Sequence, residues 1–326
     1  MDEKRVLVTG IGGNVGQGVI RNIRATNFSI KVVGTNVDYF SAGNHLCDVF
    51  YKVPYAYDAD YINTIIDIVN HEKIYLILPA TDYEVFYLAQ NQDRIPCEIV
   101  VSNVETAGHY LDKYNTFLHL SKHKIPFATS FLPSVYNTEF KDIILKPRKG
   151  RGSRGLQINP ENHTIFSDEE YMIQELHKGM EITSAFYVNK NNQLHGFITF
   201  ERILENGTTT HCKVISSYND KLKTIIEQII SVSNIKGSAN LQAIVTASGD
   251  IIPFEINCRI SGTNSIRSNF GFKDVEYALE EWLYNKTPSK PAIKEGIATR
   301  VLMDVIYENV TDFNDAKDNS AKHYIY

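Results

Sequence analysis

Cysteine is scarce in this sequence and forms no recognisable pattern. The chain contains four cysteines, Cys47, Cys97, Cys212 and Cys258. Without CxxC spacing they predict neither a zinc site nor a disulfide scaffold, and we interpret them as buried free thiols of a reducing compartment. No apolar run approaches the roughly 20 residues of a membrane span. The charged start, MDEKRVLVTG, enters a predicted strand directly rather than a signal peptide. We therefore expect a cytoplasmic protein with no membrane partner.

Several catalytic signatures are also missing. There is no GxxxxGK[ST] P-loop, no tyrosine with the YxxxK spacing of a short-chain reductase, and no convincing Ser/His/Asp or Cys/His constellation. A formal net charge of −5 argues against a general nucleic-acid binder. The 326 residues, 43% hydrophobic and 22% charged, have an ordinary soluble composition and suffice for two or three domains.

The start of the chain predicts a parallel βαβ unit. An apolar strand at 5–9 leads into GIGGNVGQG, a helix and a second strand, IKVVGTN. Gly10, Gly13 and Gly16 form a TGxxGxxG pattern that resembles the nucleotide loop of short-chain dehydrogenases, although glycines also serve tight strand-to-helix packing. An NAD(P)-dependent reductase is therefore an alternative, and the missing YxxxK counts against it.

The sequence TDYE follows the buried strand YLILPA, at the edge where open α/β sheets bind ligands. Thr81, Asp82 and Glu84 are therefore candidates for substrate contacts. The same residues fit a helix N-cap followed by acids that the helix dipole favours, and we prefer this second interpretation.

The most regular stretch runs over residues 239–259 as ANLQAIVTASGDIIPFEINCR. It predicts two strands joined by a tight turn at 248–249, where glycine adopts a positive φ without steric cost. The second strand alternates strictly between two faces. One face holds Ile252, Phe254, Ile256, Cys258 and Ile260, and the other holds Pro253, Glu255, Asn257 and Arg259.

This hairpin predicts a cluster of oxygen donors. A two-residue turn places Gln242 opposite Glu255 and Asn240 opposite Asn257. Gln242, Glu255 and Asn257 then converge as ligands of the type that Mg²⁺ prefers. A solvated strand face with a chance cluster is the alternative.

A basic, glycine-rich loop lies in the middle of the chain, in ILKPRKGRGSRG. Lys146 ends the strand before it, and the loop contains Gly150, Gly152 and Gly155. Exposed backbone N–H groups and nearby cations suit a lid over a polyphosphate. A flexible basic hairpin tip is the alternative.

Four segments in one order, DKYNTF, ILKPRKGRGSRG, IQELHKGME and FEINCRISG, carry a resemblance to a known family. The chain resembles ATP-grasp enzymes, nearest the carbamoyl-phosphate-synthase-like carboxylate–amine ligases. The resemblance implies a mixed α/β and α+β fold, with a Rossmann-like parallel sheet before a two-subdomain ATP-grasp fold. The implied domains are residues 1–107 (Rossmann-like), 108–178 (small lid subdomain), 179–312 (C-terminal subdomain with the metal site) and 313–326 (polar tail).

The resemblance also implies a site for ATP and Mg²⁺, with Mn²⁺ as a substitute. The ATP-binding residues would be Lys113, Lys146, Gly150, Gly152, Ser153, Gly155, Glu175, Leu176, His177 and Glu181. Among these, the glycine loop would cover the phosphates, the hinge at 175–177 would meet adenine, and Glu181 would hold the ribose. The metal ligands would be Gln242, Glu255 and Asn257, and the catalytic residues Arg259, Arg202 and Lys146.

The implied reaction transfers the γ-phosphoryl group of ATP to a carboxylate, and an amine then attacks the acyl phosphate. Such catalysis needs positioning and charge neutralisation rather than a side-chain nucleophile. The chain is far shorter than the synthase's large subunit and carries one grasp unit. We therefore expect a small-molecule or sugar-acid carboxylate and an amine as partners, not carbamoyl phosphate as product. The resemblance allows a homodimer, and a non-catalytic ATP-binding protein is a further alternative.

Overall fold

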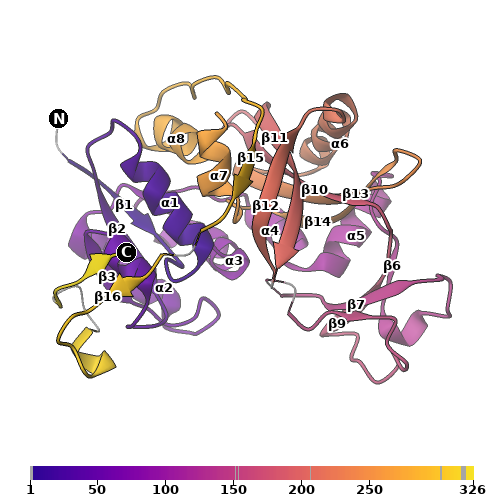
Figure 1. Ribbon diagram of the computed structural model, residues 1–326, viewed down its shortest axis with the longest axis horizontal. Helices are drawn as coiled ribbons and strands as arrows, with labels where there is room; N and C mark the ends of the chain where they lie inside the picture. Colours follow the sequence, from indigo (N-terminus) through magenta and orange to yellow (C-terminus); the bar gives the residue numbers. More distant parts are fainter. Residues whose placement is uncertain (1–2, 151, 153, 206, 302, 317–320) are drawn as a thin grey trace.

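The computed structural model describes residues 3–150, 152, 154–205, 207–301, 303–316 and 321–326. In this part of the chain the strands form sheets of five, four, six and two strands. Figure 1 shows the five-stranded sheet at one end of the molecule and the four- and six-stranded sheets at the other. Of the helices in this part, none has the length and apolar character needed to cross a bilayer.

The five-stranded sheet is parallel and forms the N-terminal unit. Its strands are β1 (Lys4–Val8), β2 (Ile30–Asn36), β3 (Val49–Lys52), β4 (Leu76–Leu78) and β5 (Glu98–Ile99), in the order β3-β2-β1-β4-β5. Its helices are α1 (Asn14–Arg24), α2 (Tyr61–Glu72), α3 (Asp82–Gln90) and α4 (Val104–Leu111), with the 3₁₀ helices η1 (Ala42–Leu46) and η2 (Gln92–Arg94). Continuous apolar runs such as LIL form the central strands because both faces of the sheet are covered.

We call the four-stranded antiparallel sheet the lid, after the lid subdomain predicted for residues 108–178. Its strands are β6 (Ser130–Phe131), β7 (Ile143–Pro147), β8 (Gln157–Ile158) and β9 (Tyr171–Glu175), in the order β6-β9-β7-β8. Helix α5 (Lys113–Lys122) precedes it, and the 3₁₀ helix η3 (Pro133–Val135) follows β6. Its own core is small, with Leu145 and Ile173 fully buried at its centre.

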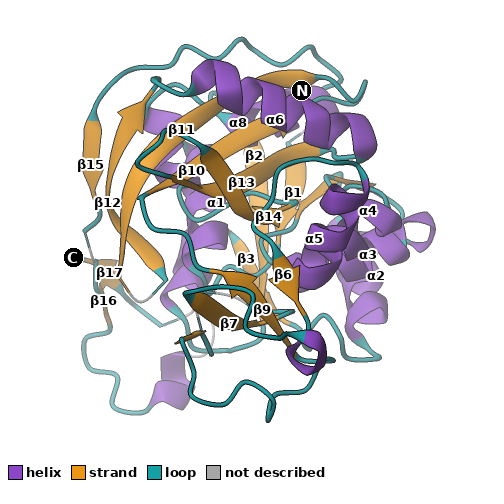
Figure 2. Cartoon of the chain, turned by 90° about the vertical axis from the view of Figure 1, so that its right-hand side faces the viewer, coloured by secondary structure: helices purple, strands orange, loops and turns teal. Residues whose placement is uncertain are grey.

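The six-stranded antiparallel sheet lies beyond the lid, and Figure 2 shows lid strands β6, β7 and β9 below β13 and β14. Its strands are β10 (Met180–Val188), β11 (Leu194–Glu205), β12 (Thr208–Ile215), β13 (Gly237–Val245), β14 (Ile251–Asn257) and β15 (Ile297–Thr299), in the order β14-β13-β10-β11-β12-β15. Helix α6 (Asn219–Val232) packs its apolar face, including Ile226 and Ile229, into the core of this sheet. The expected mixed α/β and α+β fold is thereby confirmed.

The last helix and strand are shorter than the sequence pattern suggests. The segment DVEYALEEWLYN forms α8 (Asp274–Ala278) and continues as a π-helical turn, η4 (Leu279–Leu283), after the short helix α7 (Asn264–Asn269). Of the apolar stretch after residue 296, β15 joins the six-stranded sheet, and β16 (Val305–Ile306) pairs with β17 (Tyr324–Ile325). The 3₁₀ helix η5 (Phe313–Ala316) lies between them in sequence.

The N-terminal unit shares a core with the segment that follows the hairpin of β13 and β14. Val6 and Val8 of β1 lie in one buried cluster with Val275 and Tyr277 of α8, whereas Leu7 faces the other side of the sheet, toward α2. Helices α1 and α7 are also in contact. Since α7 follows β14 in the sequence, Glu255 and Asn257 of β14 lie close to this contact between the N-terminal unit and the rest of the chain.

Candidate functional site

The hairpin of β13 and β14 has the expected pairing at the site but a different turn. Gln242 lies opposite Glu255 and Asn240 opposite Asn257, which confirms the predicted register there. The predicted two-residue turn is wrong, because Thr246 closes on Asp250 and leaves three residues in the turn, with Gly249 at φ +82°. A β-bulge between Gln242 and Ala243 compensates for the extra turn residue.

The bulge re-aims residues of β14. Phe254 has no partner on β13, so the strict alternation expected for this strand does not hold. Pro253 is buried opposite Ala243, and Phe254 lies outside the core on which the alternation placed it. The Phe254 carbonyl accepts a hydrogen bond from Lys146 Nζ at 3.3 Å, and the Phe254 ring lies 5.5 Å from the same atom. The irregularity thus directs a carbonyl toward a candidate phosphate-binding lysine.

The candidate metal ligands form one hydrogen-bonded row. Asn257 Nδ2 donates to Glu255 Oε1 at 3.1 Å, and Gln242 Nε2 donates to Asn257 Oδ1 at 3.2 Å. Arg202 extends the row, donating to Gln242 Oε1 and binding Glu181 Oε1 at 2.6 and 2.9 Å. The structure therefore brings the three predicted ligands together with Arg202 and Glu181.

This oxygen set fits a divalent cation of the Mg²⁺ type. It offers one carboxylate and two amide oxygens, which are hard donors. No three His, Cys, Asp or Glu side chains of the described chain gather into a metal-binding group, so any ion here would depend on the two amides as well as on Glu255. Burial raises the pKa of Glu255, but Lys113, Lys146, the Asn257 hydrogen bond and Arg259 together bring it below its usual value. The carboxylate is therefore held in the charged form that a metal requires.

Two lysines define the cationic side of the site. Lys146 is buried on β7, and its Nζ donates to Gln174 Oε1 of β9 at 2.7 Å. Burial lowers the pKa of Lys146 to about 8, against the opposing effect of Glu255. Lys113, the first residue of α5, donates from Nζ to the Gly150 carbonyl at 3.3 Å. The two predicted nucleotide-contacting lysines thus lie on either side of the start of the glycine loop.

A buried ion pair at the root of this loop was not predicted. Asp112 is the N-cap of α5, accepting hydrogen bonds from the backbone of Tyr114 and Asn115, and it also binds Arg148 at 2.8 Å. The signal available in the sequence was an N-cap acid directly before Lys113. Gln174 was missed as well, because its role depends on the pairing of β7 with β9.

The glycine loop reaches the opposite sheet. Gly152 and Gly155 have φ of +61° and +73°, which favours glycine. Gly207, in the turn between β11 and β12, packs on the loop so closely that an added Cβ would lie 2.4 Å from the Gly152 carbonyl oxygen. Gly207 directly precedes Thr208, the first residue of β12. The predicted donor Ser153 lies outside the described residues.

The predicted hinge connects β9 to β10. Glu175 ends β9, His177 Nε2 lies 3.3 Å from Glu175 Oε2, and Glu181 lies at the start of β10. The Leu176 N–H donates to the Asp142 carbonyl at 3.0 Å, so this backbone donor is used within the lid. Contacts of Glu175, Leu176 and His177 with adenine stay a prediction.

Two glycines near the N-terminus serve packing. Gly16 packs on the strand-to-helix turn, where an added Cβ would lie 2.7 Å from Ile11 Cα. A Cβ on Gly18 would lie 2.2 Å from Asn264 Oδ1, so α1 approaches α7 at this point. Packing therefore accounts for Gly16 of the TGxxGxxG pattern, whereas a Cβ on Gly13 would meet only the Gly10 carbonyl oxygen, at 3.7 Å.

The TDYE segment divides into two roles. Thr81 caps α3, accepting from the Glu84 N–H at 3.3 Å and donating to Glu84 Oε2 at 2.8 Å. This capping box contains a buried Glu84 whose pKa is raised by burial. Asp82 instead points across to the ATP-grasp segment, where its Oδ2 lies 2.8 Å from Arg259 Nη2. The preferred N-cap interpretation is confirmed for Thr81, substrate contacts of this segment stay a prediction, and the pairing of Asp82 with Arg259 was not predicted.

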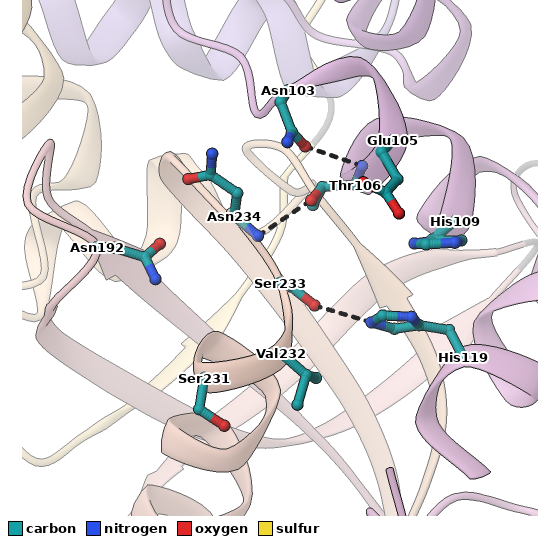
Figure 3. Close-up of a pocket in the computed structure, with 10 residues that line it drawn as sticks. All are labelled: Asn103, Glu105, Thr106, His109, His119, Asn192, Ser231, Val232, Ser233 and Asn234. Atoms are coloured by element: carbon teal, nitrogen blue, oxygen red, sulfur yellow. Dashed lines mark hydrogen bonds between the residues drawn. The ribbon is translucent and has the colours of Figure 1, made fainter. Parts of the chain in front are cut away.

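A separate pocket of about 340 Å³ lies between α4, α5 and the end of α6 (Figure 3). His119 Nε2 lies 3.3 Å from Ser233 Oγ, and its ring stacks on that of His109 at 4.2 Å. Asn103 caps α4 and Thr106 accepts from the Asn234 N–H. Several of its polar groups therefore bind one another, whereas Asn192 Oδ1 has no hydrogen-bond partner among the described residues. No residue of β14 lines this pocket.

Two family descriptions match the sequence. Residues 6–101 match the PylC-like, N-terminal domain, and residues 110–263 match the ATP-grasp domain. No curated protein matches the chain in sequence.

Several solved structures share the fold at low sequence identity. N5-carboxyaminoimidazole synthetase from Staphylococcus aureus, complexed with ADP, is 14% identical, with a TM-score of 0.73 over 92% of this chain and 82% of that one. Carboxyaminoimidazole ribonucleotide synthase from Aspergillus clavatus, complexed with ATP, is 15% identical, with a TM-score of 0.73 over 91% and 82%. The biotin carboxylase domain of 2-oxoglutarate carboxylase from Hydrogenobacter thermophilus, complexed with MgADP and bicarbonate, is 12% identical, with a TM-score of 0.70 over 94% and 75%.

Proposed function

Since the chain belongs to the ATP-grasp superfamily, we propose that it is an ATP-dependent ligase that joins a carboxylate to an amine. The observation that carries this proposal is the surrounding of Glu255, whose charge is stabilised by Lys113, Lys146 and Arg259. One charged carboxylate among several cations suits a polyphosphate with its counter-ion, because the ligand's negative charges complete the balance.

The proposed reaction has two steps. A carboxylate oxygen of the acid attacks the γ-phosphorus of ATP, the bond to the β,γ-bridging oxygen breaks, and ADP leaves with the electron pair. The amine nitrogen then attacks the acyl carbon, the C–O bond breaks, and phosphate leaves while the nitrogen loses a proton. Both steps need alignment and charge neutralisation rather than a covalent enzyme intermediate.

Each part of the site has a role in this proposal. Lys146 and Lys113 would bind the phosphates, under the described glycines of the loop, Gly150, Gly152 and Gly155. Glu255, with Gln242 and Asn257, would hold Mg²⁺, which neutralises phosphate charge when bound. Arg259 would face the transferred phosphoryl group.

Binding of the nucleotide would also change the contact between Glu181 of β10 and Arg202. Glu181 binds Arg202 at 2.6 Å, so ribose hydroxyls would replace Arg202 on that carboxylate. Arg202 would then be free to turn toward a phosphate or the acid. The backbone around Glu175, Leu176 and His177 would border adenine.

The substrates are proposed as a small-molecule or sugar acid and a small amine. A structural relative, the Hydrogenobacter thermophilus domain, was solved with bicarbonate, a small carboxylate-like anion. The substrate class is proposed from the reaction type.

A screen of acids against pooled amines, read as release of ADP and phosphate, tests the function. Release should require ATP, an acid and an amine together. Glu255→Gln should lower the rate about 10²–10³-fold, the usual effect of removing a preorganised electrostatic group. Glu169→Gln, an exposed lid acid, is the matched control and should keep the wild-type rate. Unchanged turnover in Glu255→Gln would show that the metal assignment is wrong.

A further inference from the structure

The side chain of Arg259 is held by the N-terminal unit rather than by its own sheet. Its Nη2 lies 2.8 Å from Asp82 Oδ2, at the first residue of α3, and its Nη1 donates to the neighbouring Ile260 carbonyl at 3.0 Å. We propose that Asp82 is a positioning residue, which fixes the Arg259 guanidinium for the phosphoryl-transfer step. This inference rests on the proposed function and adds a role for the N-terminal unit in it.

The whole segment around Arg259 is fixed on the N-terminal unit. Cys258 Sγ lies 2.8 Å from Ser102 Oγ, and Asn264 Nδ2 donates to the Val15 carbonyl at 3.1 Å. Asn22 Nδ2 in turn donates to Asn264 Oδ1 at 3.1 Å. These contacts hold the backbone on both sides of Arg259, whereas the Asp82 contact holds its charged group.

The guanidinium retains capacity for an anionic ligand. Arg259 Nε is buried and has no hydrogen-bond partner among the described residues. An arginine presents five N–H donors in a planar fork, and carboxylates or phosphates bind two of them side by side. One contact each of Nη1 and Nη2 sets the orientation of the group. The second N–H of each of these nitrogens is left for an oxygen of the reacting ligand.

Asp82 is itself presented by a rigid element. Thr81 and Glu84 form the capping box that fixes the first turn of α3. An acid in the first turn interacts favourably with the helix dipole. The exposed fractions of the two side chains are 17% for Asp82 and 14% for Arg259, so solvent screens this pair less than a surface ion pair.

The proposed role predicts a loss of rate rather than of nucleotide affinity. Without Asp82, Arg259 would sample other orientations, and a small misplacement of a reacting group lowers catalysis strongly. ADP, bound through the lysines and the hinge, would keep its affinity. If the contact of Asp82 with Arg259 only held the N-terminal unit against the rest of the chain, its loss would lower the stability of the protein. It would not change catalysis through Arg259.

The test uses a probe that needs no knowledge of the natural acid. Acetyl phosphate and MgADP are mixed with the full chain, and ATP is measured by luciferase. In this reverse half-reaction an ADP β-phosphate oxygen attacks phosphorus, the acyl-oxygen-to-phosphorus bond breaks, and acetate leaves with the electron pair. Asp82→Asn should lower the maximal rate about 10- to 100-fold, with the KM for ADP changed less than about twofold, and Asp82→Glu should restore part of the rate.

A double-mutant cycle separates positioning from direct contact. If Asp82 acts through Arg259, Asp82→Asn should cause no further loss in an Arg259→Ala background. Asp48→Asn, which removes the acid of another ion pair of the N-terminal unit, with Arg24 at 2.7 Å, is the matched control and should keep the wild-type rate at a temperature where all variants are folded.

Three results would overturn the inference. Asp82→Asn at the wild-type rate would exclude positioning, and an additive loss in the Arg259→Ala background would show that Asp82 acts independently of Arg259. If the wild-type chain itself transfers no phosphoryl group, the proposed function fails together with this inference. The last result differs visibly from the first two, in which the wild-type protein is active.

Discussion

A buried lysine gives the proposed nucleotide site a measurable proton linkage. Burial lowers the pKa of Lys146 to about 8, so near pH 8 a substantial fraction of the ligand-free protein carries this lysine uncharged. A polyphosphate beside it stabilises the ammonium form and raises its pKa. We therefore expect MgADP binding at pH 8 to take up protons, and its affinity to fall as pH rises further. Calorimetric titrations in two buffers with different ionisation enthalpies measure the uptake directly.

Lys146→Met should abolish this linkage, whereas Lys122→Met, at an exposed position on α5, should retain it. Equal binding enthalpies of wild-type protein in both buffers would mean that Lys146 does not change its charge on binding.

The sequence predicted this lysine from its place before a glycine loop. Its partner Gln174 was beyond sequence reasoning, because it lies 28 residues away and faces Lys146 only through strand pairing.

At the scale of elements, the hairpin of β13 and β14 shows how a correct register can follow from an incorrect turn. Alternation and a short turn sufficed to place Gln242 opposite Glu255. The turn is longer and the strand bulged by one residue, and these two departures cancel at the site. Local propensity does not foresee a bulge, because its stabilisation comes from a distant contact, here from Lys146 to the Phe254 carbonyl.

The capping box of α3 carries a stability prediction. Thr81→Ala removes the acceptor of the Glu84 N–H and the partner of the Glu84 carboxyl group. Loss of an N-cap of this type costs about 1 kcal/mol, within a range of about 0.5–2. Urea denaturation should report this decrease. Thr64→Ala, inside α2, is the matched control and should stay within about 0.5 kcal/mol of wild type. Equal stability of both variants would contradict the importance of the cap.

At the scale of the whole molecule, the order of the three main sheets was predictable from motifs in sequence order. Their junctions were not. The contact of Asp82 with Arg259 joins residues 177 positions apart, and the packing of α8 on β1 joins the two ends of the fold. Such contacts depend on how the folded N-terminal unit packs against the rest of the folded chain. The periodicity of the sequence within a single element does not predict them.

The C-terminal segment, residues 303–316, forms another such junction with the N-terminal unit. We expect the stability of this junction to decrease in acid. Tyr307 binds His45 Nε2 of η1, and the Phe40 ring lies 5.6 Å from the Tyr307 ring and 5.0 Å from the Phe313 ring. Burial, together with the nearby His323, lowers the pKa of His45 from 6.5 to about 4. The unfolded or detached state therefore binds more protons than the native state between these two values.

The sign of the effect follows from that difference. The stability of this junction should be complete above about pH 6.5 and should decrease as pH falls toward about 4. Hydrogen exchange of residues 303–316 should consequently accelerate between pH 7 and pH 5, after correction for the intrinsic pH dependence. His45→Gln cannot gain a proton there and should show a flatter profile. If the wild-type and variant profiles coincide, His45 does not control the attachment, and the aromatic contacts of Phe40 alone would hold the segment in place.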